Sequence, residues 1–267
     1  MGIQFFCTRW GSEEMNWDLF CKKVKDEGYD GIEYGIPRTD TEKDLGEIWN
    51  AAEKYGLSII AQHYDTYDAD FSKHFDLYNS WLEKIRPYPV VKINSQTGKD
   101  FFSFEQNKKL IDAATATGLN IVHETHRNKF AFAAHIAKQY FERIPDLKIT
   151  LDISHWVCVA ESYLEDQPQA VETALARTDH LHARVGYPEG PQVADPEDAT
   201  WEDALKIHLA WWDKIYQRKQ KERSVMTITP EFGPFPYMVH VPSTRNPVCD
   251  QWKANAFMMN LLKKRYQ

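Results

Sequence analysis

Cysteine is scarce in this chain, and its four cysteines lie far apart. Cys7, Cys21, Cys158 and Cys249 form no C-x-x-C pair, which excludes a zinc knuckle or a thioredoxin-like redox motif built on that spacing. We therefore expect reduced thiols packed in the core rather than a set of disulfides.

Long apolar runs and clusters of positive charge are also missing. No stretch approaches the roughly 18 apolar residues of a membrane-spanning helix, and the start, MGIQFFCTRW, lacks the charged and apolar segments of a secretory signal. The formal net charge is −7, which argues against a nucleic-acid partner because such a partner requires a basic face. We expect a cytoplasmic protein with no membrane or nucleic-acid partner, and a homo-oligomer is compatible with the sequence.

Several catalytic motifs are absent as well. The chain has no G-x-S-x-G, no P-loop and no G-x-G-x-x-G, so the acyl-hydrolase, NTPase and dinucleotide-binding functions have no support. The segment HETHR is not the zinc motif H-E-x-x-H, because Arg127 stands where the second His is required. This segment is also predicted to be a strand, whereas the zinc motif lies on a helix.

What the sequence does contain is a regular alternation of apolar strand-like runs and amphipathic helix-like segments along 267 residues. The expected helices cover about residues 16–27, 41–56, 72–85, 103–118, 130–143, 169–177, 201–218 and 249–264. Two of them begin with a capping box, Thr41 with Asp44 and Ser103 with Gln106. Eight strands alternating with eight helices predict an α/β fold, a (β/α)8 TIM barrel, as a single domain over residues 1–267.

Four polar residues end the last four predicted strands, namely Glu124, Asp152, His182 and Glu231. Adjacent strands lie ~4.8 Å apart, so these side chains can converge on one ion at the C-terminal mouth of a barrel. Three carboxylates and one imidazole form a mostly hard ligand set. The favoured divalent metal is Mn²⁺, and Mg²⁺, Co²⁺ and Zn²⁺ are alternatives.

Such a site predicts chemistry on a small carbohydrate. Four protein ligands leave two positions of an octahedral ion open for two adjacent oxygens of a hydroxy-ketone or hydroxy-aldehyde. Chelation acidifies the neighbouring C–H bond, because the metal offsets the negative charge of the enediolate that forms. Glu124 and Glu231 would then remove and return the proton.

Several segments carry a family resemblance, namely GYDGIEYG, the strand of Glu124, the D-x-x-H of Asp152 to His155, HLHARV and TPEFG. Together, from about residue 28 to residue 234, they resemble the xylose-isomerase-like TIM-barrel superfamily, in its sugar-phosphate isomerase/epimerase branch. The resemblance to the ketose 3-epimerases implies the same four metal ligands, with the two glutamates as acid and base. It also implies that His155 contacts a substrate oxygen, and it favours His182 over His180 because the family's ligand is the second His of H-x-H.

The chain departs from that family near two of the ligands. The epimerases carry an Arg six residues beyond the His ligand, where this chain has Pro188, and Arg184 lies two residues beyond instead. His126 and Arg127, directly after the first ligand, indicate an anionic or more polar substrate. The expected substrate contacts are His155, Arg184, His126, Arg127, His63 and Asn94, the last two of which could also serve as partners of the ligands.

Other polar residues at strand ends have simpler interpretations. A single carboxylate there is more often a helix cap or a salt-bridge partner, and Glu33 and Asp65 are interpreted in this way first. His180 is interpreted as a packed or surface histidine.

These observations lead to a first hypothesis and two alternatives. The first is a metal-dependent isomerase or epimerase of a sugar or sugar derivative, working through a metal-stabilised enediolate. The alternatives are a metal-dependent dehydratase or lyase acting on a keto-sugar or inosose, and a sugar-binding barrel without turnover. Endonuclease IV shares the D-x-x-H but uses further histidines for three zinc ions. Here only His63 ends a comparable strand, so DNA repair is disfavoured.

Overall fold

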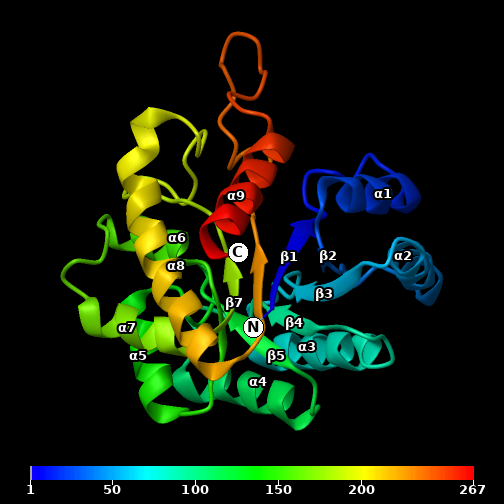
Figure 1. The fold of residues 1–267 in the computed structure, drawn as a ribbon. Coiled ribbons are helices and arrows are strands. Elements are labelled where there is room, and N and C mark those ends of the chain that lie inside the picture. The colour runs from blue at the N-terminus through cyan, green and yellow to red at the C-terminus, as the bar shows by residue number, and fades with distance from the viewer. Residues whose placement is uncertain (1) are drawn as a thin grey trace.

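Eight parallel strands form a closed barrel in the order in which they occur along the chain, with helices packed around it (Figure 1). The structure is a computed structural model that describes residues 2–267. The strands are β1 Ile3–Thr8, β2 Gly31–Gly35, β3 Ser58–His63, β4 Lys92–Ser95, β5 Ile121–Glu124, β6 Ile149–Leu151, β7 Thr178–His182 and β8 Met226–Thr229. The predicted (β/α)8 TIM barrel is confirmed.

The helices follow the predicted alternation with one addition. They are α1 Trp17–Glu27, α2 Glu42–Lys54, α3 Phe71–Ile85, α4 Phe104–Ala116, α5 Ala134–Arg143, α6 Ile153–Ala160, α7 Pro168–Arg177, α8 Glu202–Glu222 and α9 Gln251–Tyr266. The 3-10 turn η1, Ala199–Trp201, precedes α8. Both predicted capping boxes are present, at the start of α2 and of α4.

The addition is α6, which begins directly after β6. The Asp152 carboxylate accepts a hydrogen bond from the Ser154 backbone N–H and so caps this helix. The segment has only eight residues and is apolar on most of its surface, so no polar face marks it as helical. The expected count of eight helices was therefore one short for residues 2–267. Helix α5 also begins at Ala134 rather than near residue 130.

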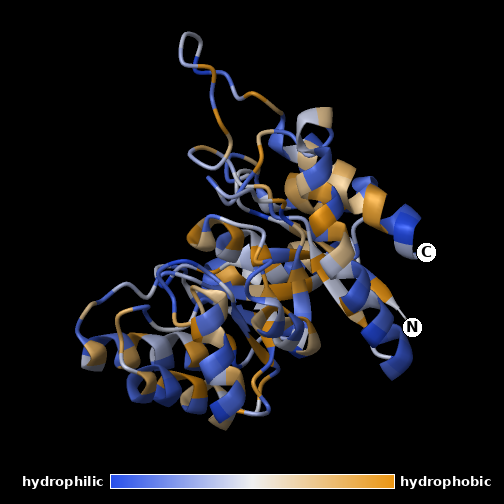
Figure 2. Ribbon diagram, turned by 90° about the vertical axis from the view of Figure 1, so that its left-hand side faces the viewer, coloured by the Kyte–Doolittle hydropathy of each residue, from blue (hydrophilic) through white to orange (hydrophobic). Residues whose placement is uncertain are grey.

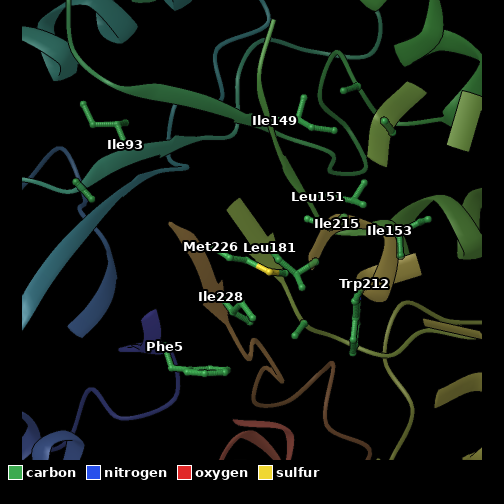
Figure 3. Close-up of a cluster of buried hydrophobic side chains, with 14 of the residues drawn as sticks. Phe5, Ile93, Ile149, Leu151, Ile153, Leu181, Trp212, Ile215, Met226 and Ile228 are labelled. Atoms are coloured by element: carbon green, nitrogen blue, oxygen red, sulfur yellow. The ribbon is translucent and has the colours of Figure 1, made fainter. Parts of the chain in front are cut away.

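The core lies between the barrel and its helical coat. Figure 3 shows Trp212 and Ile215 of α8 beside buried side chains from several strands. The strand residues labelled there are Phe5, Ile93, Ile149, Leu151, Leu181, Met226 and Ile228, all buried. Each such side chain stabilises the fold by roughly 1.5–3 kcal/mol through burial. The helices accordingly carry hydrophobic residues toward the strands and hydrophilic residues outside (Figure 2).

The N-terminal end of the barrel holds a compact ion-pair network. Lys92 at the start of β4 and Lys219 of α8 both donate to Asp179 of β7, with Nζ–Oδ distances of 3.0 and 2.5 Å. Both lysines are buried. Each buried ammonium at this end therefore has a carboxylate partner.

The cysteines are all free. Cys7 and Cys21 are buried as expected. Cys158 and Cys249 are only half-buried, because they lie near the end of α6 and before α9, so the expectation of a core position was wrong for these two. Among residues 2–267, none of the helices has the length and apolar character needed to cross a bilayer.

Candidate metal centre

The structure brings the four predicted ligands together at the C-terminal end of the barrel. Glu124, Asp152, His182 and Glu231 each offer an atom within 4.8 Å of those of the other three, and all four side chains are buried. Glu124 and His182 end β5 and β7, and the other two residues closely follow β6 and β8. This donor set suits a hard divalent cation.

The orientation of His182 supports a metal-ligand role. Its Nε2 lies 3.0 Å from Glu33 Oε1, and a proton donated there leaves the lone pair on Nδ1. Nδ1 lies 2.9 Å from Glu231 Oε2, yet it is buried and has no aligned hydrogen bond within the described residues. A buried nitrogen without a hydrogen bond, facing carboxylates, is the arrangement that a bound cation would complete. The residues present therefore fit a divalent ion.

Glu33 holds both histidines of β7. Its carboxylate lies 3.0 Å from His180 Nε2 as well as 3.0 Å from His182 Nε2, and it accepts a hydrogen bond from the Thr229 hydroxyl. The packed interpretation of His180 agrees with its burial. Of the two interpretations of Glu33, the salt-bridge partner agrees with these contacts and the helix cap does not, because its strand directs the carboxylate into the barrel. Asp65 likewise pairs with Arg38 at 3.3 Å.

The neighbouring glycine shows how closely β2 is packed at this point. A Cβ on Gly31 would lie 2.3 Å from the Ser58 carbonyl oxygen and 2.5 Å from the Phe6 ring. Only glycine fits there without displacing β3, which explains why residue 31 is a glycine. Glu33, two residues later on the same strand, supplies the buried carboxylate.

The environment drives the protonation of the two glutamate ligands in opposite directions. Burial, with the nearby carboxylates of Glu231 and Asp152, outweighs the opposing effect of His182 and raises the pKa of Glu124 to about 7. Burial would also raise the pKa of Glu231, but His182 and Arg184 outweigh it and lower that pKa. For His182, burial is outweighed by Glu231, Glu33 and Glu124, which raise its pKa well above the ordinary value, so a cation would bind Nδ1 in place of a proton.

Two amide side chains support the carboxylates from inside the barrel. Gln62 Nε2 lies 3.3 Å from both Glu124 Oε2 and Glu231 Oε1. Asn94 Nδ2 donates to Glu33 Oε1 at 2.9 Å and to Glu124 Oε2 at 3.0 Å. Asn94 thus faces the site as expected, as a partner of the ligands, while its buried Oδ1 has no partner in the described residues.

His63 lies on the opposite face of β3 from Gln62. Its ring packs against Tyr78 and Trp81 of α3, with centroid distances of 4.8 and 5.0 Å, and its Nε2 lies 2.7 Å from Thr66 Oγ1. Side chains alternate between the two faces of a strand. Choosing the last residue of β3, His63, therefore selects the face that packs against α3 instead of the face inside the barrel. The expectation that His63 faces the mouth is corrected: Gln62 takes that place.

Arg184 and His155 lie directly against the ligands. Arg184 donates to the Asp152 carboxylate, and its Nη2 lies 3.4 Å from Glu231 Oε2 and 2.9 Å from His155 Nε2. Its Nε and Nη1 are buried and have no partner within residues 2–267. Such unsatisfied donors are costly unless a polar ligand accepts from them.

His126 and Arg127 extend this group away from the ligands. The rings of His126 and His155 lie 4.0 Å apart, and Arg127 Nε lies 3.1 Å from His155 Nδ1. Burial, with His126, Arg184 and Arg127, lowers the pKa of His155 well below its ordinary value. A neutral imidazole accepts on only one nitrogen, so one of its two guanidinium contacts is unfavourable, and an acceptor on a bound ligand would relieve it.

A tyrosine from the loop after β8 also reaches the site. The Tyr237 hydroxyl lies 3.2 Å from Arg127 Nη2, and its ring lies 4.8 Å from the Arg184 guanidinium. That loop, between β8 and α9, projects from the barrel in Figure 1. No periodic pattern in the sequence identifies which residue of this loop turns inward.

Comparisons with solved structures identify proteins with a similar fold. No protein-family model and no curated protein matches this chain. The structure of endonuclease IV from Thermus thermophilus matches with a TM-score of 0.58 and 14% identity, over 98% of each chain. That of the probable 3-DHS dehydratase AsbF from Bacillus anthracis matches with a TM-score of 0.60 and 14% identity, over 99% of this chain and 100% of that one.

The chain has the fold of the xylose-isomerase-like TIM barrels. This confirms the resemblance at the level of the fold. Proteins with one fold catalyse different reactions, so the reaction of this (β/α)8 barrel must be argued from its own site.

Proposed function

We propose that this protein is a metal-dependent isomerase or epimerase of a sugar or sugar derivative that works through an enediolate. The observation that carries the proposal is the position of two carboxylates, Glu124 and Glu231, within the four-donor cluster and linked by the amide of Gln62. They come from strands separated by β6 and β7, so they can approach a bound substrate from different sides.

The side chains have distinct roles in this proposal. A divalent ion held by the four ligands would polarise the substrate carbonyl and so acidify the adjacent C–H bond. Glu231 takes the proton from that carbon, and Glu124 returns a proton to the carbon skeleton. Arg184 directs its unpartnered N–H groups at substrate oxygen, while His155 orients its guanidinium through the 2.9 Å contact.

Solvent exchange tests the proton transfer without knowledge of the product. The protein is supplied with Mn²⁺ in D₂O and offered a panel of ketoses, and deuterium incorporation next to the carbonyl is followed by NMR. Glu124→Gln and Glu231→Gln should each lower exchange by about 10²–10⁴-fold. Glu47→Gln, on the exposed surface of α2, is the matched control and should leave exchange unchanged. Exchange retained in both site variants would contradict the proposal.

Elimination is the second candidate, because a probable 3-DHS dehydratase shares this fold over almost the whole chain. The same proton abstraction would then be followed by loss of a β-hydroxyl group. Mass analysis of the product separates the two candidates, since isomerisation preserves the mass of the substrate and elimination lowers it by one water.

A further inference from the structure

Two buried lysines near the candidate metal centre have no carboxylate partner. Lys99 follows β4 and Lys129 follows β5, and they are 5% and 2% exposed. Among residues 2–267, the Lys129 ammonium makes one hydrogen bond, to the Tyr64 carbonyl at 3.4 Å. Within the described residues no hydrogen bond or ion pair to the Lys99 ammonium is present, and no carboxylate lies within 4.0 Å of either one. By comparison, the other two buried lysines, Lys92 and Lys219, both pair with Asp179.

One aromatic ring touches both of these ammonium groups. The Nζ atoms of Lys99 and Lys129 each lie 5.4 Å from the centroid of Tyr67. Tyr67 itself is 57% exposed, so its outer side is open to solvent. The two cations therefore lie beside the same partly exposed tyrosine ring.

This arrangement costs free energy unless an anion completes it. Burying an ion without a partner carries a penalty of several kcal/mol, and two neighbouring like charges repel each other. Burial and the neighbouring Lys99 together lower the pKa of Lys129 to about 8. The carboxylates of Glu124 and Asp65 offset only part of this effect on the pKa of Lys129, and Asp65 also pairs with Arg38.

Lys129 lies near the candidate metal centre. Lys129 lies five residues after the ligand Glu124, in the loop that also carries His126 and Arg127. The Glu124 carboxylate is close enough to act on the Lys129 pKa. A molecule bound at the four ligands can thus extend one end toward the two lysines.

We propose that Lys99 and Lys129 form a subsite for an anionic group, a carboxylate or a phosphate monoester, beside the ring of Tyr67. The inference rests on the proposed function only in assigning that group to the substrate. It makes the substrate class a sugar acid or a sugar phosphate rather than a neutral sugar.

The direct test observes the lysine itself and needs no turnover. Lysines are labelled by reductive ¹³C-methylation, which keeps their charge, and the Lys129 signal is assigned from its absence in Lys129→Met. Inorganic phosphate and acetate are titrated separately, with sodium chloride at equal ionic strength as the control. We expect phosphate or acetate, but not chloride, to shift the Lys129 signal and raise its titration midpoint, and the more effective anion identifies the group.

A variant pair sharpens the test. Lys99→Met should weaken the anion effect on Lys129 at least about tenfold, since one of two charges is lost. Lys108→Met, an exposed lysine paired with Asp112 on α4, should leave it unchanged. No response to phosphate or acetate, or an equal response in Lys99→Met, would overturn the subsite. Anion binding is measured separately from deuterium exchange. A failure of the anion subsite therefore leaves the proposed function standing, and a failure of the proposed function leaves the subsite standing.

Discussion

The two ends of the barrel treat buried charge differently. At the N-terminal end, Lys92 and Lys219 are neutralised by Asp179, with contacts of 3.0 and 2.5 Å. At the C-terminal end, three carboxylates crowd around His182, while Lys99 and Lys129 lack a carboxylate within 4.0 Å among the described residues.

This difference in charge pairing indicates different roles for the two ends of the barrel. A closed ion pair needs no ligand, so the N-terminal end serves the fold, as is usual for that end of a TIM barrel. At the C-terminal end, Arg184 offsets part of the negative charge through Asp152 and Glu231, whereas Lys99 and Lys129 have no such partner among the described residues. Buried charge is therefore less completely paired there, and the following predictions measure what this costs in stability.

The largest expected effect comes from removing the metal. Dialysis against a chelator should lower deuterium exchange by about 10³-fold, because an ion of this kind supplies several kcal/mol of charge stabilisation. Re-addition of Mn²⁺, Mg²⁺, Co²⁺ or Zn²⁺ one at a time should restore exchange to different degrees. Metal content by mass spectrometry accompanies each assay, and full exchange in metal-free protein would refute the role of the centre.

At the N-terminal end, Asp179→Asn should destabilise the fold by about 3 kcal/mol, because it leaves two buried ammonium groups without a carboxylate. Urea unfolding measures the change. Burial would raise the pKa of Asp179, but Lys92 and Lys219 hold it well below the ordinary value. Its contribution is therefore present above the pKa of an unfolded aspartate and is lost as the pH falls. Asp112→Asn, in an exposed pair, should change stability by less than about 0.5 kcal/mol.

Glu33→Gln tests the C-terminal end of the barrel. Glu33 contacts the candidate ligand His182 but does not belong to the four-donor cluster. The substitution should weaken Mn²⁺ binding about 10–100-fold, because the His182 ring loses the carboxylate that holds its Nε2 proton. Calorimetric titration with Mn²⁺ measures the affinity. Unchanged affinity in a folded Glu33→Gln protein would show that the contact with His182 does not support the metal.

The smallest effect is expected for Lys129→Met, which should raise stability by about 1 kcal/mol at pH 7 because an unpaired buried charge is removed. The folded protein loses the Lys129 proton near pH 8, whereas the model value for lysine is 10.5. The unfolded chain therefore binds more protons in this interval, and wild-type stability should rise with pH across it. The variant should lack this rise, and urea unfolding at several pH values reveals the difference. Lower stability in the variant would mean that the ammonium is satisfied after all.

Much of this architecture could be predicted from local sequence. The capping boxes at Thr41 and Ser103 were correct because a cap is formed by residues three apart. The clustering of the four candidate ligands could be predicted because each ends or follows a strand, and consecutive strands of a barrel are neighbours. Helix α6 was missed because an apolar eight-residue helix has no polar face to mark it.

Other features depended on the direction in which a side chain points. Gln62 and His63 are adjacent in sequence, and only strand alternation against α3 placed Gln62 inside the barrel. Glu33 looked like an isolated carboxylate until β7, nearly 150 residues later, brought His180 and His182 against it.

The order of residues along the chain thus determined the barrel and its four metal-ligand candidates, because alternating periodicity and strand-end position are local properties. Only the folded molecule decided which charges were neutralised. Whether a lysine meets a carboxylate depends on side chains from distant segments, as with Lys92 and Asp179. For Lys99 and Lys129 the fold brought two cations to one tyrosine ring with no carboxylate in reach.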